Sequence, residues 1–160
     1  MSASISSVLV ANRGEIARRV FRTCRDLGIR TVAVYSDADA GAPFVGDADV
    51  AVRLPGNAPS DTYLRGDLVI AAALKAGADA IHPGYGFLSE NAGFARAVAD
   101  AGLTWIGPAP DTIDSMGDKI RAKELMDSAG VPILSVDAAK AKKSDFPLLV
   151  KASAGGGGRG

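Results

Sequence analysis

The sequence is poor in the residues that several kinds of site and interface require. Among its 160 residues are one cysteine, Cys24, and one histidine, His82, and only 6% of the residues are aromatic. A single cysteine excludes an intramolecular disulfide and favours a reducing compartment, which predicts a cytoplasmic protein. His82 has no cysteine or second histidine with which to hold a structural metal ion. The scarcity of aromatic side chains argues against a surface that stacks nucleic-acid bases.

The chain also lacks an excess of charge and any long apolar run. Its 18 basic and 18 acidic residues give a net charge of zero, so no long-range field favours nucleic acid or an anionic membrane surface. The first residues contain no basic segment followed by an apolar core, which argues against a signal peptide. No apolar run approaches the ~20 residues of a transmembrane helix. We therefore expect neither a nucleic-acid partner nor a membrane partner.

Short apolar runs alternate with helical repeats through most of the chain. Apolar residues recurring every three or four positions predict helices over 15–27, 64–76, 91–101 and 111–129, the last interrupted at 117–119. Short apolar runs predict strands over 7–11, 30–35, 48–54, 80–82 and 103–106. A strand, a helix and a second strand within about 30 residues form a βαβ unit and predict a parallel sheet. The whole order predicts a doubly wound, Rossmann-like α/β domain.

The ten-residue string at 82–91 follows the strand at 80–82, and open α/β sheets bind ligands at the carboxyl ends of their strands. Two glycines, Gly84 and Gly86, free its backbone. Tyr85 and Phe87 offer flat surfaces, and Glu90 can accept hydrogen bonds. We expect the string to border a ligand site and His82 itself to be structural.

The turn after the first strand, 12–15, carries one glycine and lacks the Gly-x-Gly-x-x-Gly fingerprint of dinucleotide-binding domains. Asp37 and Asp39 follow the second strand, where an acidic residue could hold a ribose. Without the fingerprint, a nicotinamide-dependent dehydrogenase is disfavoured. The predicted helix at 15–27 has a polar face that is either solvated or binds a partner. This face carries four arginines and one aspartate: Arg18, Arg19, Arg22, Arg25 and Asp26.

The last stretch combines a short apolar run at 148–150 with Lys151, four glycines at 155–158 and Arg159. A backbone without Cβ atoms can wrap an anion and offer its N–H groups to phosphate oxygens, and the two cations add positive charge. This is not a Walker A loop, and a linker, a tail or a turn are alternatives to phosphate binding. Nothing follows Gly160, so we expect a truncated chain in which 131–160 is poorly ordered because its strand lacks partners.

Four segments, in order and at matching spacing, carry a resemblance to a known family: 10–17, 82–91, 117–119 and 151–160. The chain closely resembles the N-terminal part of a biotin carboxylase. More narrowly, it is similar to the biotin-containing α-subunit of an actinobacterial acetyl/propionyl-CoA carboxylase. The resemblance implies a pre-ATP-grasp domain of Rossmann-like fold at 1–113. It also implies linker helices and the truncated beginning of an ATP-grasp domain at 114–160.

The resemblance implies an ATP-dependent ligase that turns ATP, bicarbonate and biotin into carboxybiotin, ADP and phosphate. The implied cofactors are ATP, Mg²⁺ or Mn²⁺, and biotin attached to a carrier domain outside this chain. The implied partners are the rest of the subunit, the biotin carboxyl carrier domain, a carboxyltransferase β-subunit and a second copy of the full-length protein. Pyruvate, methylcrotonyl-CoA and urea carboxylases share these features and remain open, as does a non-catalytic dimerisation module.

The resemblance also assigns residues. It implies nucleotide binding by two lysines and the glycine run: Lys119, Lys151, Gly155, Gly156, Gly157 and Gly158. It implies that Tyr85, Gly86 and Glu90 line the biotin and bicarbonate site, and that Arg19, Arg22 and Asp26 form a dimer interface. The family's metal-binding glutamates and its bicarbonate-binding arginine are expected beyond Gly160. We therefore expect no metal site and no complete catalytic set in this chain, which should be inactive by itself.

Overall fold

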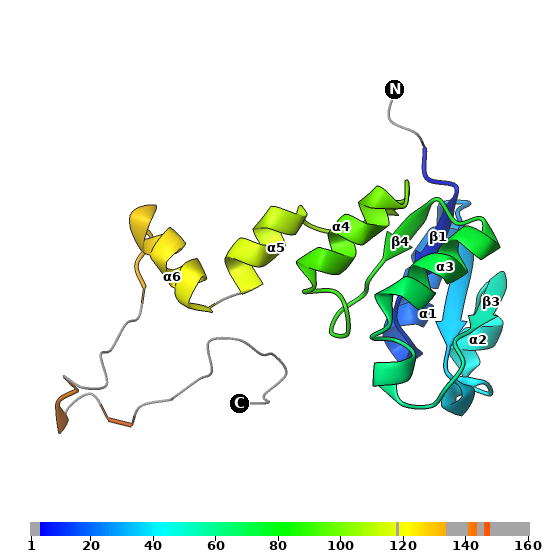
Figure 1. The fold of residues 1–160 in the computed structure, drawn as a ribbon, viewed down its shortest axis with the longest axis horizontal. Helices are drawn as coiled ribbons and strands as arrows, with labels where there is room; N and C mark the ends of the chain where they lie inside the picture. The colour runs from blue at the N-terminus through cyan, green and yellow to red at the C-terminus, as the bar shows by residue number, and fades with distance from the viewer. Residues whose placement is uncertain (1–3, 118, 134–140, 144–145, 148–160) are drawn as a thin grey trace. The chain divides into compact units, whose positions relative to one another are not determined.

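The computed structural model describes residues 4–117, 119–133, 141–143 and 146–147 (Figure 1). The chain divides into two compact units, Met1–Pro110 and Asp111–Gly160. The five strands found among the described residues all lie in the first unit. The second unit contains helices α5 (Pro110–Gly117) and α6 (Lys119–Ser128), where the sequence predicts a helix over 111–129. The predicted interruption includes Asp118, which lies outside the described residues.

The first unit has the predicted alternation of strands and helices. Its strands are β1 (Ser7–Val10), β2 (Arg30–Tyr35), β3 (Val50–Arg53), β4 (Ala80–His82) and β5 (Thr104–Trp105). Its α-helices are α1 (Gly14–Asp26), α2 (Pro43–Asp47), α3 (Gly66–Ala76) and α4 (Ala92–Asp100). Short 3₁₀ turns stand at Asp37–Asp39 and Pro59–Asp61. The sequence does not predict α2 or these turns, because segments this short show no helical period.

The five strands form one parallel sheet in the order β3-β2-β1-β4-β5. From β1 the chain builds outward through β2 to β3, and it then returns to the other side of β1 to add β4 and β5. The prediction of a doubly wound α/β domain is therefore confirmed. The strand order reverses between β1 and β4, and a crevice at such a switch point is where open α/β sheets bind ligands.

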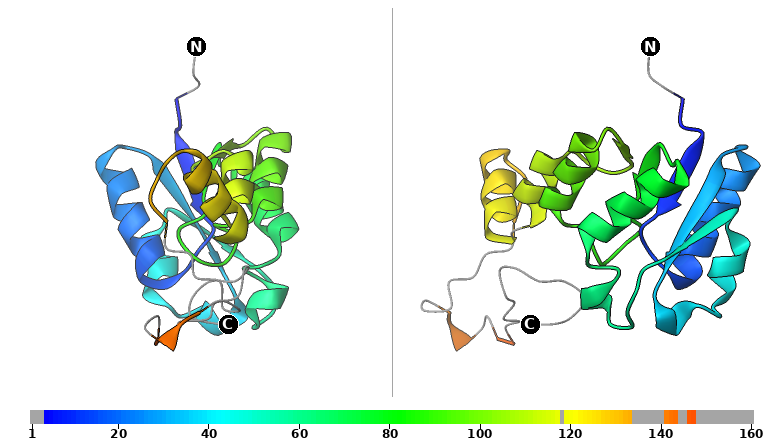
Figure 2. Two further views of the ribbon diagram at one scale, coloured as in Figure 1. Left: turned by 90° about the vertical axis from the view of Figure 1, so that its left-hand side faces the viewer. Right: turned by 45° about the vertical axis from the view of Figure 1, so that its right-hand side comes forward.

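Alternate residues of each strand face opposite sides of the sheet, and each side is covered by helices. On one side, Leu9, Val32 and Ile81 pack with residues of α3 and α4, among them Val69 and Phe94. The other side joins Val8, Val10 and Ala33 to α1 and α2: Ala17, Phe21, Cys24 and Phe44. Figure 2 shows α1, in blue, across the sheet from the green helices α3 and α4. The result is a three-layer unit with two cores.

Two leucines at the ends of the predicted helices 15–27 and 64–76 are exposed. Leu27 continues the apolar stripe of α1 in the sequence, but its side chain is 68% exposed. The helix ends at Asp26, and Leu27 already belongs to the turn that Gly28 completes with a φ of 70°. The side chain of Leu27 therefore does not continue the buried face of the helix. Leu64 is 43% exposed because α3 begins only at Gly66. Cys24 is buried, and its burial raises the pKa of the thiol.

One carboxylate holds β1 and β4 together at the amino-terminal edge of the sheet. Asp79, just before β4, accepts hydrogen bonds from the Ser6 N–H at 3.0 Å, the Ser6 hydroxyl at 2.6 Å and the Ser7 N–H at 3.1 Å. Burial alone would raise the pKa of Asp79, but these hydrogen bonds outweigh it and hold the pKa below its ordinary value of 3.8. The ionised carboxylate therefore stabilises the folded unit.

Replacing this carboxylate should change how stability depends on pH. Because the folded pKa of Asp79 is lowered, its contribution is fully present above the ordinary value and is lost as the pH falls through the folded value. We expect Asp79→Asn to lower the free energy of unfolding by about 1 to 2 kcal/mol at neutral pH. The difference from the wild type should narrow as the pH falls below 3.8 and through the lower pKa of the folded state. Urea denaturation at several pH values, followed by circular dichroism, measures it.

A matched control is Asp100→Asn, which removes an acidic charge that makes no hydrogen bond within the described residues. It should leave the free energy of unfolding nearly unchanged at every pH. A constant gap between the wild type and Asp79→Asn from pH 7 to pH 3 would contradict the prediction.

Candidate functional site

The candidate site lies where the strand order reverses, at the carboxyl ends of β1 and β4. The Ala11 N–H donates to the His82 carbonyl at 2.9 Å and extends the pairing of these two strands by one residue. Beyond this bond the two strands diverge, and β1 continues into the turn 12–15 while β4 continues into the loop 83–91. These are two of the strings that the sequence singles out, and the fold places them side by side.

Asn12 connects the turn to the loop through its side chain. The carboxamide is buried, and its Nδ2 donates to the carbonyls of Pro83 at 2.9 Å and Tyr85 at 2.7 Å. Its Oδ1 accepts from the Arg13 N–H at 3.0 Å. Both N–H donors of the carboxamide and its oxygen therefore have hydrogen-bond partners. Sequence reasoning assigned no role to Asn12, although it lies inside the string 10–17.

Gly84 makes room for this carboxamide. Its φ of 68° lies in the left-handed region, and a Cβ atom built at this position would lie 2.6 Å from Nδ2 of Asn12. Only glycine satisfies both conditions without strain. The Gly84 N–H also donates to Nδ1 of His82 at 2.9 Å. Burial lowers the pKa of His82, which keeps the ring neutral so that Nδ1 can accept this bond, and this supports a structural role for the histidine.

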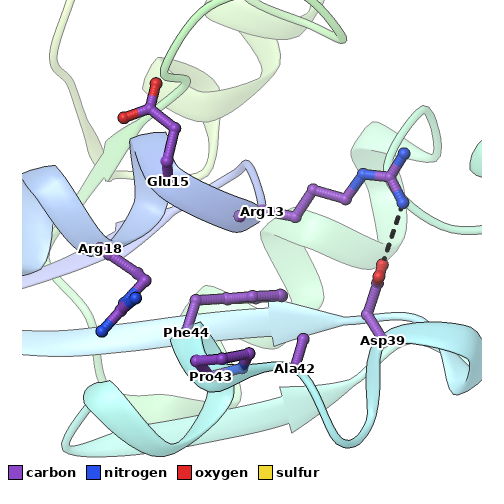
Figure 3. A pocket seen from close by; sticks show the side chains of 8 residues that line it. Arg13, Glu15, Arg18, Asp39, Ala42, Pro43 and Phe44 are labelled. Carbon is purple, nitrogen blue, oxygen red and sulfur yellow. Dashed lines mark hydrogen bonds and ion pairs between the residues drawn. The ribbon is translucent and has the colours of Figure 1, made fainter.

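Arg13 packs its guanidinium against two aromatic rings and one carboxylate. Its Cζ lies 5.5 Å from the ring centroid of Tyr63 and 5.7 Å from that of Phe87, and these two rings stack at 5.1 Å. Its Nη1 lies 3.3 Å from the carboxylate of Asp39 (Figure 3). Phe87 has a φ of 43°, which is strained for a residue with a side chain. Its contacts with Arg13 and Tyr63 stabilise that conformation.

Asp39 collects hydrogen bonds beside this cation. Tyr63 donates its hydroxyl to the Asp39 carboxylate at 2.6 Å, and the hydroxyl of Ser36 donates to it at 2.9 Å. Burial, and then the bond to Asp39, raise the pKa of Tyr63 to about 12. Burial alone would raise the pKa of Asp39, but the bonds from Tyr63, Ser36 and Arg13 outweigh it and leave the pKa lowered. At neutral pH the pair is therefore a neutral phenol and an ionised carboxylate.

A second tyrosine joins the loop to α1. The hydroxyl of Tyr85 donates to Oε1 of Glu15 at 2.7 Å, and this bond raises the pKa of Tyr85. The ring of Tyr85 is 60% exposed. Because Glu15 lies in the first turn of α1, the bond fixes the exposed ring against the same segment that holds the loop backbone.

Two hollows meet at this turn, and Arg13 and Gly14 border both. One, of about 370 Å³, is lined by residues of the turn and the loop, including Asn12, Tyr85 and Gly86. The other, of about 430 Å³, lies on the side of Arg18 and Asp39, and the side chains of Ala42, Pro43 and Phe44 form its apolar part (Figure 3). The structure thus brings Tyr85 and Gly86 to one hollow. Glu90 is exposed and is not among the residues that line it.

The arginine-rich face of α1 has two parts. Arg18 pairs with the carboxylate of Asp47 at 2.5 Å, and Nη2 of Arg25 donates to the Asp47 carbonyl at 2.7 Å, so both bind the end of α2. The three residues expected at a dimer interface are exposed: Arg19, Arg22 and Asp26. Arg19 and Arg22 form no ion pair with any described residue.

The side chains expected to bind nucleotide lie outside the described part of the chain. Lys119 begins α6, but its side chain lies outside the described part of the chain, as do Lys151 and Gly155 to Gly158. Among the described residues, no three His, Cys, Asp or Glu side chains lie close enough to hold a metal ion. None of the helices in the described ranges is both long enough and apolar enough to span a membrane.

The strand order and the helices on both faces of the sheet define a doubly wound α/β domain. Residues 4–113 match the family model described as "Biotin carboxylase, N-terminal domain". Because this match covers more than half of the chain, the chain belongs to the biotin carboxylase N-terminal domain family.

Relatives with different names are similar to nearly the whole chain. The mitochondrial methylcrotonoyl-CoA carboxylase subunit alpha of Oryza sativa is 52% identical over 98% of this chain. The biotin-dependent acyl-coenzyme A carboxylase alpha3 subunit of Mycobacterium leprae is 48% identical over 99% of it. A solved biotin carboxylase domain of a thermophilic 2-oxoglutarate carboxylase, bound to bicarbonate, is 53% identical over 81% of the chain, with a TM-score of 0.77. The chain spans only 23% and 28% of the two relatives and 29% of the solved chain.

The contact between Gly84 and Asn12 predicts a difference between two glycines. Gly84 and Gly102 both have a left-handed backbone, with φ values of 68° and 75°, but a Cβ atom at Gly102 would meet nothing within 4 Å. Gly102→Ala should cost about 1 kcal/mol of stability through backbone strain alone. Gly84→Ala should cost a further 1 to 3 kcal/mol or so, because it displaces a buried carboxamide from two carbonyls. Urea denaturation of the two variants measures the difference, and equal losses would show that the contact contributes nothing.

Proposed function

We propose that this chain is the N-terminal part of a biotin carboxylase subunit, which consumes ATP and bicarbonate to carboxylate biotin on a carrier domain. One observation carries the proposal. The turn 12–15 and the loop 83–91 form one hydrogen-bonded unit at the switch point of the sheet, where this fold binds ligands. Membership of the biotin carboxylase N-terminal domain family supports it, as does the 53% identical structure bound to bicarbonate.

Within this reaction we propose that Tyr85, Gly86 and Glu90 line the site for biotin and bicarbonate. We propose that Lys119, Lys151 and the glycines at 155–158 bind ATP together with Mg²⁺ or Mn²⁺. ATP would supply the phosphoryl group. Phosphoryl transfer depends mainly on positioning and on neutralising charge, which lysines and a glycine-rich backbone can supply. This assigns 1–113 to the pre-ATP-grasp domain and 114–160 to linker helices and the beginning of an ATP-grasp domain. By itself the chain should then be inactive.

For the acceptor, we propose an acyl-CoA such as acetyl-CoA or propionyl-CoA, reached through a carboxyltransferase β-subunit. The Mycobacterium leprae relative bears the name of an acyl-coenzyme A carboxylase and the Oryza sativa relative that of a methylcrotonoyl-CoA carboxylase. Pyruvate and urea carboxylases remain alternatives, because the acceptor is chosen outside these residues. A non-catalytic dimerisation module and a cytoplasmic location also stay predictions from the sequence.

The test of the function uses the polypeptide whose N-terminal part is this chain. It should release phosphate from ATP only when bicarbonate and biotin are both present. Replacing Lys119 and Lys151 by Gln should lower kcat/KM for ATP by at least about tenfold each, because each substitution removes a charge from the phosphate site. Lys75→Gln on α3 is the control and should leave kcat/KM unchanged. ATP hydrolysis that is indifferent to bicarbonate would contradict the proposal.

We also propose that the full-length protein is a homodimer through Arg19, Arg22 and Asp26, which are exposed on α1. Replacing Arg19 and Arg22 together by Ala should raise the Kd of the dimer at least about tenfold, measured by sedimentation equilibrium. Replacing Arg18 and Arg25 by Ala removes the same charge from the same helix, but these two side chains bind Asp47. That control should leave the Kd unchanged. An equal effect of both pairs would show that net charge, and not a specific interface, controls association.

A further inference from the structure

The turn 12–15 and the loop 83–91 contact one another almost residue by residue. Asn12 bonds two loop carbonyls, the Arg13 guanidinium lies near the Phe87 ring, and Glu15 accepts from Tyr85. We propose that Asn12 is a positioning residue for carboxylation: its carboxamide fixes the loop backbone that presents Tyr85 and Gly86 to biotin and bicarbonate. This inference rests on the proposed function and adds a residue that acts through the loop without touching substrate.

The geometry of the carboxamide suits this role. The two carbonyls that it bonds lie on either side of Gly84, so a single planar group fixes the path of the backbone across that glycine. The Oδ1 atom is held in turn by the Arg13 N–H at 3.0 Å, which fixes the plane of the carboxamide. Asn12 is only 4% exposed, so water does not compete for its donors. The direction of both N–H groups is therefore set by the turn.

The loop has few other backbone anchors. The bonds from Ser89 to Gly86 and from Asn91 to Leu88 are internal turns, which do not locate the loop on the sheet. Within the described residues, the hydrogen bonds that reach the backbone of 83–90 from outside the loop are the Gly84 N–H bond to Nδ1 of His82 and the two from Asn12 to the carbonyls of Pro83 and Tyr85. The bond to His82 reaches only Gly84, so the Tyr85 carbonyl and the adjoining Gly86 are held in position by the Asn12 side chain.

The side chain at position 12 needs two donors and one acceptor. An aspartate has the same size, but when ionised it donates nothing and would direct lone pairs at both loop carbonyls. The loop would then move away from the turn while the hydrophobic cores stay intact. A displacement of about 1 Å at a reacting group can cost up to ~100-fold in rate, which gives the proposal a measurable consequence.

The experiment compares Asn12→Asp with Asp79→Asn in the full-length polypeptide. Both substitutions change a polar side chain that joins residues next to β1 to residues next to β4, more than 70 positions away. Asp79 does so at the amino ends of the two strands and Asn12 at their carboxyl ends. Asn12→Asp should raise KM for bicarbonate and biotin on the order of 10- to 100-fold and leave KM for ATP within about twofold. Asp79→Asn should leave all three KM values unchanged. Asn12→Ser, which keeps one donor, should give intermediate KM values and serves if Asn12→Asp does not fold.

Hydrogen exchange followed by mass spectrometry separates the two ways in which this inference can fail. The peptide covering 82–91 should exchange faster in the Asn12 variants than in Asp79→Asn at equal overall stability. Unchanged exchange there, or identical KM values for the Asn12 variants and Asp79→Asn, would overturn the positioning role even in an active carboxylase. A wild-type protein that uses ATP without regard to bicarbonate would instead overturn the proposed function. Faster exchange with raised KM for bicarbonate and biotin supports both.

Discussion

The candidate site depends on one buried carboxamide, that of Asn12, placed where the strand order reverses. Parallel strands that diverge at a switch point leave unpaired backbone groups at their carboxyl ends, and buried polar groups without partners are costly. Asn12 satisfies two of these carbonyls and is itself satisfied by the Arg13 N–H. The absence of a side chain at Gly84 is the condition that lets the carboxamide approach. The crevice can therefore keep a defined shape while its outer wall remains exposed.

Around this contact, charge is neutralised close to where it arises. Arg13 pairs with Asp39, whose carboxylate also accepts hydrogen bonds from Tyr63 and Ser36. Arg18, which lines the same hollow as Arg13 and Asp39, pairs with Asp47. Exposed ion pairs add little stability singly, but each of these joins elements far apart in the sequence. They connect the 3₁₀ turn at Asp37–Asp39 and helix α2 to the beginning of α1.

Much of the fold follows from the sequence because its signals are local. A period of two or of three to four residues fixes strands and helices, and glycines at 28 and 77 end α1 and α3 near the predicted positions. Leu27 breaks the rule because a stripe of apolar residues does not show where the helix stops. Helix α2 was not predicted because its five residues form little more than one turn and show no helical period. The loop at 82–91 could be located by its composition, but the role of Asn12 could not, because it depends on a contact across 71 to 73 positions.

The same contact explains why this Rossmann-like unit does not resemble a dinucleotide-binding domain at its first turn. In that class the turn after the first strand is rich in glycine, so that the backbone can approach a pyrophosphate at the helix N-terminus. Here the corresponding turn carries side chains whose polar groups are already used: Asn12 bonds the loop, Arg13 pairs with Asp39 and Glu15 accepts from Tyr85. A carboxylate at the first turn of α1 also repels a phosphate. The turn thus holds a neighbouring loop in place of a nucleotide, and this agrees with the proposal that lysines and glycines later in the chain bind ATP.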